Sequence, residues 1–101
     1  MINNVTISSS NTELLKAKIQ TAVTTIIFCN TGSSEDTLSV YVVKNGGTPN
    51  SSNTIISNLK VVNDDTFVFD TEKLILEKGD SVVAKSNNGT ISATISVMEL
   101  A

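Results

Sequence analysis

The sequence predicts an all-β protein, an antiparallel β-sandwich of the Ig-like or jelly-roll-like kind with seven to eight short strands. Three observations support this prediction. Apolar and β-branched segments recur along the chain. Turn-forming residues separate them at intervals of about eight to twelve residues. Residues that favour helices are scarce, whereas Ser, Thr and Asn are abundant. With 101 residues, 40% of them apolar and 17% charged, the chain is expected to form one globular domain.

The start of the chain is set apart from this domain by its composition. We expect residues 1–13 to form an N-terminal arm and residues 14–101 to form the β-sandwich domain. Val5-Thr6-Ile7 can form a short strand, and the Ser8–Asn11 segment has the composition of a linker. An arm that packs on a neighbouring molecule and a frayed terminus explain the segment equally well.

Residues 12–20 allow two interpretations. Leu15 and Ile19 have helical spacing, but Leu15, Ala17 and Ile19 also alternate with lysines as in a strand. We favour the strand, because no other part of the chain requires a helix. The next segment, Thr21–Asn30, is rich in β-branched residues and is apolar on both faces, which predicts a central strand.

The remaining strands follow from alternating patterns. A loop after Asn30 is expected to be kept in solvent by Glu35 and Asp36. Phe67 and Phe69 fall on one face of their strand, with Val68 on the other. The expected strands after this loop are Thr37–Lys44, Ile55–Val62, Thr66–Asp70, Leu74–Leu76, Ser81–Lys85 and Thr90–Val97.

The last three of these strands are predicted to be joined by two tight hairpin turns. Gly79 can take the positive φ that a hairpin loop with a bulge needs, and the Asn88-Gly89 pair is a strong hairpin signal. Leu74–Leu76 is apolar on both faces and is therefore expected to be buried on both sides or to lie close to a second sheet. In Thr90–Val97, apolar residues alternate with a row of hydroxyl side chains, which predicts a half-buried strand.

Charge and hydropathy exclude several classes of function. The net charge is −3 and arginine is absent, so nucleic acid is not expected as a partner. The longest apolar run, Ile26–Cys29, is too short to span a bilayer, and no membrane association is expected. The start of the chain lacks the features of a signal peptide, which favours a protein made in a cytoplasm.

The sequence predicts no catalytic residue, no metal site and no cofactor. Histidine is absent, which removes the commonest general base and activator of serine or cysteine nucleophiles. Cys29 is expected to be a buried structural thiol. One group of carboxylates allows a calcium site on a sandwich edge or a glycosidase pair, although a solvated turn is favoured over both. This group consists of Asp64, Asp65, Asp70, Glu72 and Asp80.

From Leu14 to Leu100 the chain resembles a family of small β-sandwich virion proteins encoded by tailed bacteriophages. The arm, residues 1–13, lies outside the resemblance. The segments that carry it are Thr21-Ala22-Val23-Thr24-Thr25-Ile26-Ile27-Phe28-Cys29-Asn30, Val40-Tyr41-Val42-Val43 ahead of Asn45-Gly46-Gly47, Leu76-Glu77-Lys78-Gly79-Asp80-Ser81-Val82 and Ile95-Ser96-Val97-Met98-Glu99-Leu100.

The resemblance implies a non-enzymatic virion structural protein, made in the host cytoplasm and located in the virion. Its expected partners are copies of itself and other subunits of the capsid, neck or tail, as an assembly or decoration component. We expect variable loops, such as residues 47–54, to make such contacts. The alternative is a glycan-binding or adhesion module on a tail or cell surface, in one form calcium-dependent through Asp64, Asp65 and Asp70.

Overall fold

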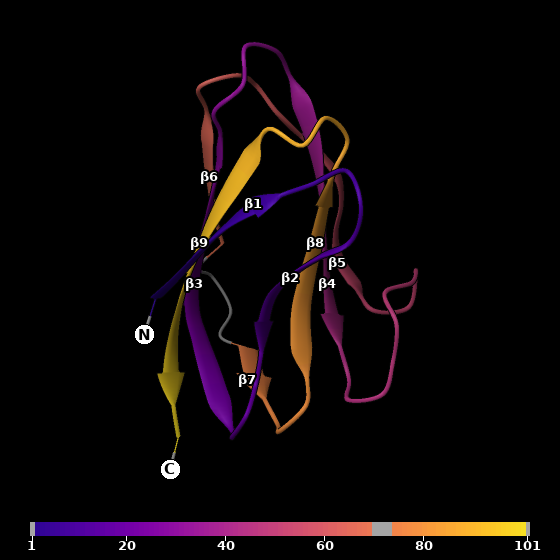
Figure 1. Ribbon diagram of the computed structural model, residues 1–101, viewed down its shortest axis with the longest axis vertical. Coiled ribbons are helices and arrows are strands. Elements are labelled where there is room, and N and C mark those ends of the chain that lie inside the picture. The colour runs from indigo at the N-terminus through magenta and orange to yellow at the C-terminus, as the bar shows by residue number, and fades with distance from the viewer. Residues whose placement is uncertain (1, 70–73, 101) are drawn as a thin grey trace.

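The computed structural model describes residues 2–69 and 74–100, which form nine strands and no helix. Two antiparallel sheets pack face to face (Figure 1), so the predicted β-sandwich is confirmed, with slightly more strands than expected. The strands are β1 (Ile2–Ile7), β2 (Thr12–Lys16), β3 (Thr21–Asn30), β4 (Asp36–Val43), β5 (Thr54–Val61), β6 (Thr66–Phe69), β7 (Leu74–Leu76), β8 (Ser81–Ser86) and β9 (Ile91–Glu99).

Strand order divides the molecule into sheet A and sheet B. Sheet A has the order β1-β9-β3-β6, and β7 also pairs with β3. Because β9 runs along one side of β3, β6 and β7 share the other side: β6 pairs with residues 26–29 of β3, and β7 with residues 21–23. Sheet B has the order β2-β8-β4-β5. The prediction that Thr21–Asn30 forms a central strand is therefore confirmed.

The pairing scheme is that of a jelly roll. Apart from the short β7, the first strand pairs with the last (β1 with β9), the second with the second last (β2 with β8), the third with β6, and β4 with β5. These nested antiparallel pairs amount to one long hairpin. Pairing of β9 with β3 and of β8 with β4 winds the hairpin into two sheets.

The segment predicted as an arm is part of the sandwich over its described residues. Residues 2–7 pair with residues 91–96 of β9, and Ile7 is fully buried in the core. Residues 12–13 begin β2, which confirms a strand rather than a helix in the ambiguous segment. The chain packs on its own core here because β1 supplies the edge neighbour that β9 needs opposite β3.

The two turns predicted as hairpins have the expected backbone but the wrong pairing. Gly79 and Gly89 have φ values of 92° and 74°, as the turn chemistry predicts. However, β7 and β9 belong to sheet A and β8 to sheet B, so each turn crosses between sheets. Both sides of β8 are already occupied, by β2 and β4. A turn motif reports the local chain reversal and does not identify the pairing partner.

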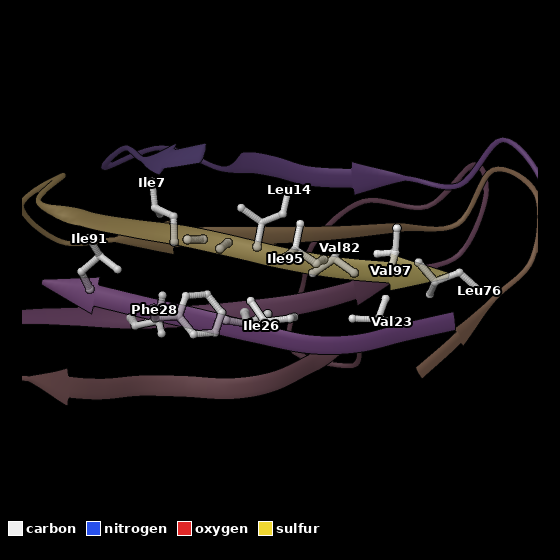
Figure 2. Close-up of a cluster of buried hydrophobic side chains, with 14 of the residues drawn as sticks. Ile7, Leu14, Val23, Ile26, Phe28, Leu76, Val82, Ile91, Ile95 and Val97 are labelled. Carbon is white, nitrogen blue, oxygen red and sulfur yellow. The ribbon is translucent and has the colours of Figure 1, made fainter. Parts of the chain in front are cut away.

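The core lies between the sheets and is dominated by β3, β8 and β9 (Figure 2). Ile91, Ala93, Ile95 and Val97 are all buried, which confirms the predicted alternation of β9. The ring of Phe28 is fully buried, and Phe67 and Phe69 pack against the same core, as expected.

Two predictions of burial are wrong. Ile75 is exposed, because β7 is a short strand at the edge of sheet A rather than a strand covered on both sides. Cys29 is only half-buried. Phe28 and Asn30 on either side of it point into the core, so the thiol points to the outer side of the sheet.

We expect Ile95→Asp to lower the free energy of unfolding by more than about 4 kcal/mol, because it places an unpaired charge in the core. Ile95 is 1% exposed and lies opposite Ile26. Thr94→Asp, on the outward side of the same strand, is the control and should cost less than about 1 kcal/mol. Urea unfolding of both variants checks this. Similar losses in the two would contradict the inward orientation of Ile95.

Candidate functional site

The outer face of sheet A carries no charged side chain among the described residues. Strand register places its side chains in rows across the sheet, so that Ile27 lies between Thr94 and Val68. Hydroxyl, amide and apolar groups make up the whole surface. This uncharged face consists of Ile2, Asn4 and Thr6 of β1, Ser92, Thr94, Ser96 and Met98 of β9, Ala22, Thr25, Ile27 and Cys29 of β3, Thr66 and Val68 of β6, and Ile75 of β7.

Exposed apolar side chains are concentrated on the uncharged face. Of the eight large hydrophobic residues that are exposed, five lie on it: Ile2, Ile27, Val68, Ile75 and Met98. They form neighbouring pairs, because Ile27 lies opposite Val68, while Ile75 and Met98 flank Ala22. Single exposed apolar residues are ordinary, but the gathering of most of them on one uncharged face favours an interaction surface.

The opposite outer face, on sheet B, has the composition of an ordinary solvated surface. Glu13 of β2, Lys85 of β8 and Lys60 of β5 are exposed there. Charged side chains on sheets normally prevent sheets from associating with one another. The chain contains 17 charged residues, 7 basic and 10 acidic, so a lack of charge is not general to the protein. Among the described residues, it is specific to the outer face of sheet A.

The second distinctive feature is a buried carboxylate at one end of the sandwich. Asp36 begins β4 and is 2% exposed, although the sequence predicted a solvated loop residue. Its Oδ1 accepts hydrogen bonds from the backbone N–H groups of Thr37, Asn87 and Asn88 at 2.8 to 2.9 Å. Its Oδ2 accepts from the backbone N–H of Thr90 at 3.2 Å and from the Thr90 hydroxyl at 2.9 Å.

These contacts keep Asp36 ionised despite its burial. Burial works against the charged form, but hydrogen bonds from the backbone N–H of Asn88, from the N–H and hydroxyl of Thr90 and from the N–H of Thr37 outweigh it. The pKa of Asp36 is therefore lowered below its ordinary value. A carboxylate that accepts several backbone N–H groups is a strong structural anchor.

A buried asparagine extends this polar cluster to a third loop. The Asn30 side chain is fully buried; its Nδ2 donates to the carbonyl oxygens of Ser34 and Val61, each at 2.9 Å. Its Oδ1 accepts from the backbone N–H of Gly32 and lies 2.9 Å from the hydroxyl oxygen of Thr90, whose single proton is shared between this oxygen and Asp36 Oδ2. No buried side-chain polar atom of the described residues lacks a partner. The Asp36–Asn30–Thr90 cluster is thus satisfied internally and serves as a structural lock between loops.

The three described carboxylates of the group considered for a calcium site, Asp64, Asp65 and Asp80, are not all brought together. Asp64 and Asp65 lie in the β5–β6 turn next to Asn30, at the end that holds the lock. Asp80 lies at the opposite end, where its carboxylate accepts from the backbone N–H groups of Asn45 and Glu77. Asp70 and Glu72 lie outside the described residues. Residues 2–69 and 74–100 contain no group of three or more acidic or cysteine side chains suited to a metal ion.

The loop expected to contact partners, residues 47–54, is organised by its own amides. Asn50 and Asn53 both donate side-chain N–H groups to the carbonyl oxygen of Thr48, at 2.9 Å. The Asn50 Oδ1 accepts from the backbone N–H and hydroxyl of Ser52. The structure therefore gives the loop a defined shape, and its contact with partners stays a prediction.

Comparisons with models of known protein families, with curated proteins and with solved structures find no match to this chain. Within the described residues there is no helix of the length and apolar character needed to cross a membrane.

We expect Asp36→Asn to lower the free energy of unfolding by about 3 kcal/mol at pH 7, because an amide cannot accept all five hydrogen bonds. The folded-state pKa lies below the unfolded value of about 3.9. The contribution of Asp36 is therefore complete above that pH and is lost as the pH falls through the folded-state pKa.

Urea unfolding between pH 7 and pH 2 checks both parts of this prediction. The gap between the parent protein and Asp36→Asn should narrow as the pH falls below about 3.9. Glu35→Gln, which removes the exposed carboxylate next to Asp36, is the control and should leave stability at pH 7 almost unchanged. A gap that stays constant over this range would contradict the role of the ionised carboxylate.

Proposed function

We propose that this chain is a non-enzymatic structural protein of a bacteriophage virion. It binds copies of itself and neighbouring capsid, neck or tail subunits through the uncharged face. The observation that carries the proposal is the uncharged outer face of sheet A, where exposed Ile27 and Val68 lie side by side among hydroxyl groups.

A second copy of the chain is a suitable occupant of this face. With a net charge of −3, two copies repel one another in general, but surfaces without charge add no local repulsion when they meet. Sheets pack well through small, β-branched and apolar side chains. The uncharged face supplies these from β3, β6 and β7, with hydroxyl groups of β9 and β1 around them. Such a surface suits an isologous pairing about a two-fold axis.

The assignment to a virion rests on two further supports. One is the resemblance to phage virion proteins between Leu14 and Leu100. The other is the jelly-roll pairing scheme, an architecture that viral capsid proteins use, as do lectins. The second support is an analogy at the level of the fold. Together they favour a particle component that assembles side by side with its neighbours.

The glycan-binding alternative receives less support from the described residues. All three phenylalanines belong to the core, and Tyr41 is half-buried, so no exposed aromatic platform for a sugar is present among them. Among the described residues no third ligand joins Asp64 and Asp65, and Asp70 lies outside them, so the structure adds no support for the calcium-dependent form.

We expect Ile27→Lys to weaken self-association at least about tenfold, equivalent to 1.4 kcal/mol, because it puts a charge at the centre of the uncharged face. Ile55→Lys is the matched control, since Ile55 is 40% exposed on sheet B and Ile27 is 39% exposed. Sedimentation velocity of the purified proteins over a range of concentrations measures the effect.

Ile55→Lys should associate like the parent protein. Mass spectrometry of purified phage particles should find the chain in the virion. A parent protein that stays monomeric at all concentrations and never co-purifies with particles would overturn the proposal. Equal loss of association in the Ile27 and Ile55 variants would show that the uncharged face has no special role.

A further inference from the structure

The chain contains two Asn-Gly pairs, and the structure places them in contrasting surroundings. Asn45-Gly46 lies in the turn after β4, and Asn88-Gly89 lies in the turn between β8 and β9. Both asparagines are exposed, and the two glycines have positive φ values of 84° and 74°. Exposure and local sequence therefore do not distinguish the pairs, and a difference in their chemistry has to come from their hydrogen bonds.

In an Asn-Gly pair the asparagine side chain can react with its own backbone. The backbone nitrogen of the glycine loses its proton to water or hydroxide and attacks Cγ of the asparagine. A bond forms between that nitrogen and Cγ, the bond from Cγ to Nδ2 breaks, and ammonia leaves a cyclic imide. Water then opens the imide to aspartate or isoaspartate, so the reaction consumes only water. Glycine favours the attack because it has no Cβ to crowd the approach.

The Asn88-Gly89 pair is held by the Asp36 lock. The N–H of Gly89 donates to Oγ of Ser86 at 2.9 Å, so the attacking nitrogen is engaged. The Nδ2 of Asn88, which would leave as ammonia, donates to the carbonyl oxygen of Glu35 at 3.1 Å. The backbone N–H of Asn88 donates to Oδ1 of Asp36 at 2.8 Å. Attack on Asn88 therefore requires several hydrogen bonds of the lock to break first.

The Asn45-Gly46 pair is anchored only at its two flanks. The backbone N–H of Asn45 donates to Oδ1 of Asp80 at 3.0 Å, and the N–H of Gly47 donates to the carbonyl oxygen of Lys44 at 2.8 Å. Neither the N–H of Gly46 nor the side-chain amide of Asn45 hydrogen-bonds to any described residue. The two groups that the lock engages at Asn88-Gly89 are thus free at Asn45-Gly46.

We propose that Asn45 is a site of spontaneous deamidation in the folded protein, whereas Asn88 is protected by the hydrogen bonds of the Asp36 lock. The fold thereby selects one of two pairs that have the same sequence and are both exposed. This inference goes beyond the proposed function, because the reaction requires neither a partner nor assembly.

Deamidation of Asn45 changes a contact between two turns. A Cβ on Gly79 would lie 2.4 Å from Cγ of Asn45, so the asparagine amide packs directly over that glycine. The reaction replaces this amide with a carboxylate and adds one negative charge to a protein whose net charge is −3. The isoaspartate product also carries the main chain through the former side chain, immediately before residues 47–54. The modified protein is therefore separable from the parent by charge.

Peptide mapping by mass spectrometry, on purified protein incubated at mildly alkaline pH, tests the proposal at both sites at once. In the folded protein, Asn45 should be converted at least about tenfold faster than Asn88, because only Asn88 must first lose hydrogen bonds. In urea above the unfolding transition the two rates should become similar, because the lock is then absent. The comparison uses one chain, so each pair serves as the control for the other.

Two variants assign the effect to named groups. Asn45→Gln keeps an amide but requires a larger ring, so the acidic species seen on ion exchange should disappear. Ser86→Ala removes the acceptor of the Gly89 N–H and should speed conversion of Asn88 while leaving Asn45 unchanged; thermal melts confirm that it folds. If it does not fold, the comparison between folded and urea-unfolded parent protein still decides.

Three results would overturn the proposal. The first is conversion of Asn88 as fast as Asn45 in the folded protein, or no conversion of Asn45 at all. The second is a ratio of the two rates that is the same in urea, which would assign the preference to local sequence. The third is an unchanged Asn88 rate in folded Ser86→Ala, which would remove the protecting role of the lock.

Discussion

Closure of one end of the sandwich depends on a single buried carboxylate, Asp36. Of the eight connections between successive strands, only β4–β5 joins two strands that pair with each other. The β6–β7 connection joins two strands that both pair with β3, and all the others cross from one sheet to the other. The sheets are therefore held together by side-chain packing and by closure of the loops at the two ends. Asp36 closes one end, because it binds the β8–β9 turn to the start of β4 through four hydrogen bonds, from Asn87, Asn88 and Thr90. Asn30 and Thr90 carry the same closure to the β5–β6 turn through backbone and side-chain bonds.

The lock also orders the surface that we propose to be functional. β9 begins directly after the locked turn, and its outward residues form the middle of the uncharged face. At the other end, Asp80 plays a related part by capping the turn that carries Lys78. In both places a carboxylate is used for backbone hydrogen bonds, and the neighbouring charges are left exposed.

The fold class could be predicted from the sequence because alternation and turn residues act locally. The strand Ile91–Glu99 and the positive φ of Gly79 and Gly89 follow directly from such patterns. Strand pairing could not be predicted, because it depends on which strand edges remain unpaired once the chain has collapsed into a compact state. The lock was also missed: Glu35-Asp36 reads as a solvated loop, and the donors that bury Asp36 come from about fifty residues further along the chain.

The surfaces were only partly visible in the sequence. The hydroxyl row of β9 is apparent from alternation, but the uncharged face also needs Ile27, Val68 and Ile75 from three other strands. Likewise, Lys78 is distant in sequence from Lys16 and Lys18, and only the bonds between Ala17, Gly79 and Asp80 show that the turns that carry these lysines lie together.

The only cysteine offers the most direct test of the central claim that the uncharged face is buried by assembly. Cys29 is half-buried on this face, between Ser92 and Thr66, and it needs no substitution. We predict that the rate of maleimide labelling of Cys29 falls as protein concentration rises and copies associate, and falls further in intact particles. A labelling rate per molecule that is the same in dilute protein, in concentrated protein and in particles would contradict the account.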